Sequence, residues 1–72
     1  MNLLELGREI KTLRKNRGLT QESLAKLSNI SRATLSKLEN GNVAQISIVT
    51  LNDILNHLGY ELDMKVSNPF ES

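Results

Sequence analysis

Apolar residues recur every three or four positions as far as residue 58, which is the spacing that buries one face of a helix. The apolar stripes consist of Leu3, Leu6, Ile10 and Leu13; of Leu24 and Leu27; of Ile30, Leu35 and Leu38; and of Ile48, Leu51, Ile54, Leu55 and Leu58. The pattern predicts an all-α domain of four to five short helices that bury these stripes in one core.

Hydroxyl residues and glycines mark where these helices begin and end. Side chains that can cap a helix N-terminus stand at Thr20, Ser31 and Ser47. Glycines that can follow a helix in the left-handed conformation stand at Gly18, Gly41 and Gly59. The short segment 28–30 separates the second helix from the third, and Asn29 within it tolerates a positive φ. The sequence therefore predicts two short helices joined by a tight turn.

The period changes to two in "YELDMKV", residues 60–66, where apolar and charged residues alternate as in a half-buried strand. The apolar members are Tyr60, Leu62, Met64 and Val66. A lone strand leaves its backbone groups unpaired, so we expect it to pair with the same strand of a second copy. This predicts a homodimer in which residues 1–59 form the helical domain, residues 60–66 the dimerisation strand and residues 67–72 a flexible tail.

Charge is distributed unevenly along the 72 residues, although the net charge is only +1. Residues 1–40 hold eight cations and four acids, a balance of +4, whereas residues 41–72 hold one cation and four acids, a balance of −3. Such asymmetry indicates that the N-terminal part faces a polyanion.

Several classes of protein are disfavoured by composition. There is no cysteine, so disulfides and thiolate metal sites are excluded, and the apolar runs are far too short for a membrane span or a signal peptide. His57 has no second metal ligand at a useful spacing, and no glycine-rich phosphate loop or nucleophile–base pair is evident. We expect a cytoplasmic protein that is not an enzyme and holds neither a metal nor a cofactor.

The third helix, within "ISRATLSKLENG" at residues 30–41, has an outward side of small and polar groups with two cations. That side consists of Arg32, Ala33, Ser36, Lys37 and Asn40. It can simply be solvated, or it can enter the major groove of DNA, where arginine bonds guanine and a small side chain lets the backbone approach. The small Ala25, at the fifth position of the preceding helix, is typical of the close helix crossing in a helix-turn-helix.

The stretch "GLTQESLAKLSNISRATLSKLENG" resembles the DNA-binding helix-turn-helix of the phage repressor and Cro type, often called the XRE family. The opening "LTQESLA" and the close "LSKLENG" carry the resemblance, which extends over about residues 6–58. The ending "LNDILNHLGYELDMKV", a helix followed by an alternating strand, resembles HipB-type antitoxins more specifically. Those antitoxins are similar to dimeric repressors whose C-terminal strands pair across the dimer.

The resemblance implies a role for individual residues. Arg32, Ala33, Ser36 and Lys37 would read bases, and Gln21, Ser31 and Asn40 would contact DNA phosphates. Arg14 and Glu39 occupy positions that form a structural ion pair in this family, so Arg14 is expected to belong to the scaffold. The turn departs from the family pattern, which usually has glycine at the position of Asn29 and an apolar residue at that of Ser28.

The function implied by the resemblance is that of a homodimeric repressor bound to a palindromic operator in double-stranded DNA. It further implies an antitoxin that represses its own operon and has a HipA-like kinase toxin as its partner. Two alternatives stay open. One is a stand-alone phage-type repressor. The other is a protein-interaction module whose main role is to bind a toxin kinase through the acidic second part and Phe70.

Overall fold

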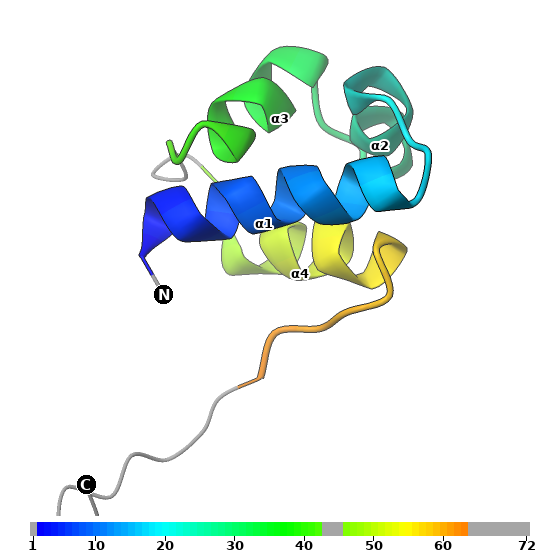
Figure 1. Cartoon of the computed structure of the whole chain (residues 1–72). Coiled ribbons are helices and arrows are strands. Elements are labelled where there is room, and N and C mark those ends of the chain that lie inside the picture. Colours follow the sequence, from blue (N-terminus) through cyan, green and yellow to red (C-terminus); the bar gives the residue numbers. More distant parts are fainter. Residues whose placement is uncertain (1, 43–45, 64–72) are drawn as a thin grey trace, which may run out of the picture.

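The computed structural model describes residues 2–42 and 46–63, which form four helices joined by short loops. The helices are α1 (Leu3–Asn16), α2 (Gln21–Leu27), α3 (Arg32–Glu39) and α4 (Ile48–His57). Both α1 and α2 pack on α3, and α4 packs on α2. In the view of Figure 1, α2 and α3 lie on one side of α1 and α4 lies on the other. The described part of the chain has the predicted all-α fold.

Each helix begins at a capped N-terminus. The side chains of Thr20, Ser31 and Ser47 accept the backbone N–H three residues ahead, at distances of 3.0, 3.0 and 3.1 Å. All three caps were predicted, because a hydroxyl before an amphipathic segment can satisfy a free N–H of the first turn. A fourth cap, which was not predicted, is Asn2, whose Oδ1 accepts from the N–H of Glu5 at 2.8 Å.

The turn between α2 and α3 has the geometry that was predicted from Asn29. This residue has a φ of 55°, the only positive φ at a non-glycine residue among those described. The left-handed conformation lets the chain reverse within the segment 28–30, and the N–H of Ile30 bonds back to the carbonyl of Ala25 at 2.9 Å. Asn29 therefore fills the place at which the family usually has glycine.

The core lies where the stripes of the four helices meet. Its fully buried side chains are Ile10, Leu24, Leu35, Leu38, Ile54 and Leu58. Ala25 is also buried, as expected for a small residue where α2 crosses α3 closely. Leu6, Leu13, Ile30 and Leu51 are partly buried against this cluster. The core thus confirms most of the predicted apolar stripes.

Three residues assigned to the stripes are instead largely exposed, so their assignment was wrong. Leu27 is 54% exposed because the buried side of α2 follows Leu24, Ala25 and Ser28, and Leu27 points roughly 100° away from the middle of that arc. Leu3 and Ile48 are 53% and 75% exposed. Each is the first residue of its helix, one turn before the first partly buried leucine of the stripe.

α1 approaches the C-terminal end of α3 very closely at Gly7, which is buried. A Cβ atom at this position would lie 2.9 Å from the carbonyl oxygen of Glu39 and 2.9 Å from the backbone nitrogen of Gly41, and closer still to the carbonyl oxygen of Leu38. Glycine in a helix interior is otherwise unfavourable. Its presence here allows α1 and the end of α3 to pack backbone against backbone.

The segment that follows α4 contains the first part of the predicted strand. Residues 60–63 carry no strand pairing in the single chain, and Tyr60 and Leu62 are both exposed. The N–H of Leu62 donates to Oδ1 of Asn52 at 2.9 Å, which fixes the segment beside α4. The remaining dimerisation residues, Met64 and Val66, and the predicted tail 67–72 lie outside the described residues.

Candidate nucleic-acid interface

The helix α3 has two sides of opposite character. Its inward side consists of Leu35, Leu38 and Glu39, which are all buried. The outward side comprises the exposed Arg32, Ala33, Lys37 and Asn40, together with the half-buried Ser36. At about 100° per residue these five positions fall within an arc of roughly 140°. The structure therefore brings the predicted base-reading residues together on one solvent-facing surface.

A buried ion pair holds this surface in place. The Nε of Arg14 donates to Oε2 of Glu39 at 2.7 Å, and Nη2 donates to Oε1 at 3.1 Å. The third guanidinium nitrogen, Nη1, donates to the carbonyl of Leu19 at 2.7 Å. This fork links α1 and the loop before α2 to the last residue of α3. The expected scaffold role of Arg14 and Glu39 is confirmed.

Gln21 lies at the edge of the same network. Its Nε2 donates to Oε1 of Glu39 at 3.0 Å, so one amide hydrogen is used inside the protein. The bond orients the amide nitrogen, which carries a second hydrogen that can serve as a donor to an anion. Gln21 and Arg32 also line one surface hollow, where the first turns of α2 and α3 come together. Gln21, a predicted phosphate contact, and Arg32, a predicted base contact, therefore lie in the same part of the surface.

The other two predicted phosphate contacts lie at the ends of α3. Ser31 caps the helix, and its hydroxyl is also 2.8 Å from the hydroxyl of Thr34. This oxygen is thus engaged locally, whereas the side chain of Asn40, at the C-terminal cap, is exposed. Contacts of Ser31 and Asn40 with DNA stay predictions.

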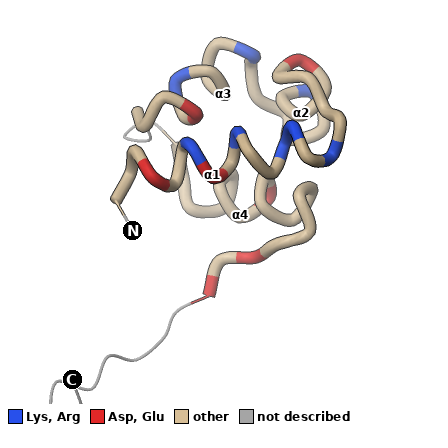
Figure 2. The backbone as a smooth tube through the Cα atoms, in the orientation of Figure 1, with Lys and Arg blue, Asp and Glu red and all other residues tan. Residues whose placement is uncertain are grey.

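Positive and negative charges are concentrated in different helices (Figure 2). All Lys and Arg residues of the described chain lie in α1, α2, α3 and the loop after α1. In contrast, α4 and residues 60–63 carry only acids besides His57, namely Asp53, Glu61 and Asp63. The part of the molecule that contains the helix-turn-helix is thus the one that can attract a polyanion.

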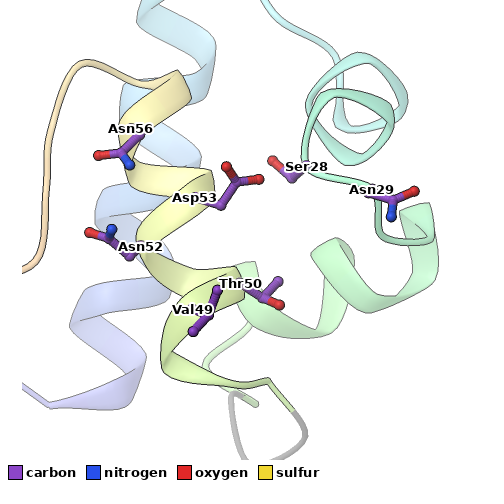
Figure 3. A pocket seen from close by; sticks show the side chains of 7 residues that line it. All are labelled: Ser28, Asn29, Val49, Thr50, Asn52, Asp53 and Asn56. Atoms are coloured by element: carbon purple, nitrogen blue, oxygen red, sulfur yellow. The ribbon is translucent and has the colours of Figure 1, made fainter.

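The turn next to this surface contains a buried polar atom. Ser28 is 5% exposed, and its hydroxyl has no hydrogen-bond partner among the described residues. Figure 3 shows the Ser28 side chain directed toward α4, on the side where Asp53 lies. A buried hydroxyl without a partner is unfavourable relative to an apolar group of the same size. This is the position at which the family usually has an apolar residue, so the departure has a structural consequence.

The comparison with known families decides what this arrangement is. Residues 10–64 match the model of the family HTH_3, which is described as helix-turn-helix. The chain belongs to the helix-turn-helix family HTH_3. Its fold is that of a DNA-binding regulator of the phage-repressor type, as the motifs in the sequence predicted.

Known proteins that are similar to this chain include an antitoxin and a controller protein. The antitoxin PezA of Streptococcus pneumoniae is 36% identical over an alignment of 78 positions that covers 85% of this chain and 49% of PezA. A chain of the HipA-HipB-O2-O3 complex is 32% identical, with a TM-score of 0.71, and the match covers 96% of this chain and 93% of that chain. The restriction-modification controller protein C.AhdI of Aeromonas hydrophila is 32% identical, with a TM-score of 0.74, over 82% of this chain and 88% of that one.

These similarities confirm the resemblance to HipB-type antitoxins within the phage-repressor family. The chain spans between 36% and 56% of the length of the curated relatives that it matches. It matches nearly the whole of the chain in the HipA-HipB-O2-O3 complex.

Residues 2–42 and 46–63 contain no helix that is long and apolar enough to cross a membrane. No group of three His, Asp or Glu side chains in the same part of the chain converges to hold a metal ion. His57 has one acidic neighbour, Asp53, with 3.7 Å between Nε2 and Oδ2.

Sequence reasoning missed Gly7, Asn52 and Val49. Gly7 left a signal, since a glycine inside an otherwise regular helical pattern indicates a close backbone approach. The contact of Asn52 with the backbone of Leu62 joins residues ten positions apart, and no local pattern predicts it. Val49 is exposed beside Ile48 at the start of α4, which only the packed structure reveals.

Proposed function

We propose that the protein is a homodimeric transcriptional repressor that binds a palindromic operator through the outward side of α3. The observation that carries the proposal is the opposition of the two sides of this helix. Leu35, Leu38 and Glu39 are buried and fix the helix, whereas Arg32 and Lys37 are exposed on the opposite side. A helix held in this way can enter the major groove as a rigid unit.

We expect some of these side chains to contact bases and others to contact phosphates. Arg32, at the start of α3, has the fork geometry that bonds guanine, and the neighbouring Ala33 is small enough for close approach to the base edges. Ser36 and Lys37 lie one turn further along the same side. Gln21 would donate its second amide hydrogen to a phosphate, because Glu39 already holds the first. Phosphate contacts of this kind position the protein, and the base contacts specify the sequence.

The proposed dimer forms through the C-terminal segment. Residues 1–59 would form the DNA-binding domain, residues 60–66 a strand that pairs with the same strand of a second copy, and residues 67–72 a tail. The exposure of Tyr60 and Leu62 in the single chain supports this assignment. Both are apolar members of the alternating pattern, and a dimer could bury them. Two copies related by a two-fold axis would present their α3 helices to major grooves about 34 Å apart.

We further propose that the protein is the antitoxin of a HipA-like kinase toxin and represses its own operon. The support is the match over 96% of this chain and 93% of a chain in the HipA-HipB-O2-O3 complex, together with the similarity to the antitoxin PezA. Repression would act by occupancy of the operator. A stand-alone repressor is the second candidate, favoured by the similarity to the controller protein C.AhdI.

Selection from a pool of random DNA duplexes tests the proposal directly. The purified protein is mixed with the pool, and the retained duplexes are sequenced. We expect enrichment of a palindrome with a fixed spacing between its half-sites. Weak, salt-sensitive retention without any enriched sequence would contradict a base-reading role for α3 and favour a protein-interaction module instead.

A binding assay with a HipA-like kinase distinguishes the two regulatory candidates. A purified HipA-like kinase would be titrated with the protein. Formation of a stoichiometric complex supports the antitoxin. Absence of binding at micromolar concentration, with operator binding intact, supports the stand-alone repressor.

A further inference from the structure

A polar hollow lies between α4 and the turn that joins α2 to α3. It is lined by Ser28 and Asn29 of the turn and by one side of α4, which contributes Thr50 and Asp53. Apart from Val49 every side chain that lines it is polar, and none of them is a Lys or an Arg. In Figure 3, Thr50 and Asp53 leave α4 on the side that faces the turn. The hollow therefore presents hydrogen-bonding groups and a negative charge without a cation of its own.

Ser28 is the most deeply buried group of this hollow. It is 5% exposed, and its Oγ has no hydrogen-bond partner among the described residues. Figure 3 shows the side chain directed toward α4 and Asp53. A hydroxyl can accept two hydrogen bonds and donate one, and its staggered rotamers let it turn toward a group that enters the hollow. A buried polar group that the fold leaves unpaired calls for an explanation, and departures of this kind are expected at functional sites.

Asp53 supplies the negative charge, as the only acid that lines the hollow. Its side chain is 50% exposed, and 3.7 Å separates its Oδ2 from Nε2 of His57. That separation is too long for a hydrogen bond, so both carboxylate oxygens can accept bonds from a ligand. Thr50 lies one turn earlier on α4, and its Oγ1 accepts the hydroxyl of Ser47 at 3.0 Å, which leaves a second lone pair.

These groups favour an organic cation that carries several N–H donors. An anion would be repelled by Asp53. A divalent metal ion takes more oxygen ligands and more charge than one carboxylate provides, and no group of three His, Asp or Glu converges among the described residues. A guanidinium has five N–H donors in one plane, so it can bond a carboxylate through two of them while others reach neighbouring oxygens.

We propose that this hollow binds a guanidinium or alkylammonium group. Asp53 is its counter-charge, and the hydroxyls of Ser28 and Thr50 are further acceptors. The bound group joins α4 to the turn before α3, and thereby adds a contact that holds the turn in place. The inference is independent of the proposed repressor function, because none of these three residues is among the proposed DNA contacts.

Titration of the isotope-labelled protein with methylguanidinium, followed by two-dimensional NMR, tests the site. We expect saturable shifts of the amides of Ser28, Asn29 and Asp53 at concentrations that leave the protein folded. Tetramethylammonium has the same charge but no N–H, and urea has N–H donors but no charge, so neither should produce saturable shifts there. Shifts that spread over the whole chain without saturation, or equal binding of tetramethylammonium, would overturn the inference.

The substitution Asp53→Asn tests the counter-charge while it keeps the shape of the side chain. We expect the Kd for methylguanidinium to rise at least about tenfold, because the charge-assisted bonds are lost. The matched control is Asp63→Asn, which makes the same change at an acid outside the hollow and should leave the Kd nearly unchanged. Equal losses of affinity in the two variants would mean that binding follows the net charge alone, and would refute the site.

The substitution Ser28→Ala separates binding from folding. We expect this variant to melt at a higher temperature, because an unpartnered hydroxyl is removed, and yet to bind methylguanidinium several-fold more weakly. Thr12→Ala also removes a hydroxyl, at an exposed position of α1 outside the hollow, and should gain stability without any loss of affinity. Unchanged affinity in Ser28→Ala would contradict the proposed site.

Two further probes distinguish the sources of the cationic group. One is agmatine, a free guanidinium compound, and the other is a capped Gly-Arg-Gly peptide, which presents the same group on a polypeptide. Tighter binding of the peptide than of agmatine indicates an arginine side chain of a partner protein, and tighter binding of agmatine indicates a free cation. Binding of either probe that Asp53→Asn does not weaken would count against the site.

Discussion

The substitution Gly7→Ala addresses the close approach of α1 to the C-terminal end of α3. In an open helix interior this change stabilises by roughly 0.5–1 kcal/mol, because alanine has the higher helix propensity. Here the new Cβ would lie 2.9 Å from the carbonyl oxygen of Glu39 and 2.9 Å from the nitrogen of Gly41, and closer still to the carbonyl oxygen of Leu38. All three neighbours are backbone atoms, so α1 and the end of α3 must move apart.

The magnitude follows from these opposed effects. Overpacking of a tight contact costs about 1–3 kcal/mol, and the upper end applies because backbone cannot rotate away as a side chain can. After the gain in propensity, a net destabilisation of about 2 kcal/mol remains. For a domain of this size, 1 kcal/mol changes Tm by about 4–8 °C, so we expect a fall of roughly 8–16 °C.

Thermal unfolding followed by circular dichroism measures this effect, with two controls. Thr12→Ala, at an exposed position of the same helix, should raise stability by a few tenths of a kcal/mol through propensity alone. Gly18→Ala meets no atom within 4 Å but must keep a φ of 68°, so it should cost about 1 kcal/mol through the backbone. A Gly7→Ala variant as stable as the unmodified protein would refute the argument from close approach.

Three other predictions concern the scaffold and the DNA-binding surface. Glu39→Ala leaves the buried Arg14 without its partner and should lower the free energy of unfolding by about 3–5 kcal/mol in urea denaturation; a loss below 1 kcal/mol would contradict a structural role. Ser28→Ala removes an unpartnered buried hydroxyl and should raise stability by about 1 kcal/mol, so a clear loss in the same assay would mean that the hydroxyl is satisfied. Arg32→Ala should cost about 1–3 kcal/mol on the selected operator and relax the choice of one base, whereas Gln21→Ala should weaken binding to all sequences evenly. Equal losses for Arg32→Ala on operator and random DNA would remove Arg32 from the base-reading residues.

The sequence by itself determined the features that depend on neighbours within about four residues. The caps at Thr20, Ser31 and Ser47 formed as predicted, because a hydroxyl reaches the N–H three positions ahead whatever the rest of the chain does. The positive φ of Asn29 is local in the same way. The two sides of α3 were also readable, since periodicity alone separates Leu35 and Leu38 from the polar positions between them.

The pairing of Arg14 with Glu39 was anticipated only through the resemblance to a family. The two residues stand 25 positions apart, and no local rule joins them. Once the ion pair is in place, the bond from Gln21 to Glu39 follows from the position of α2 beside the end of α3. Sequence could therefore name these residues but could not describe the geometry that connects them.

Only the tertiary structure decided which apolar residues lose contact with water. Leu27 and Ile48 satisfy the helical period as well as their buried neighbours do, yet both are exposed. Burial depends on where the other helices lie, and the periodicity of one helix does not give their positions. Periodicity fixes the direction of a side chain around its helix, whereas the packing of the other helices determines whether anything lies there to cover it.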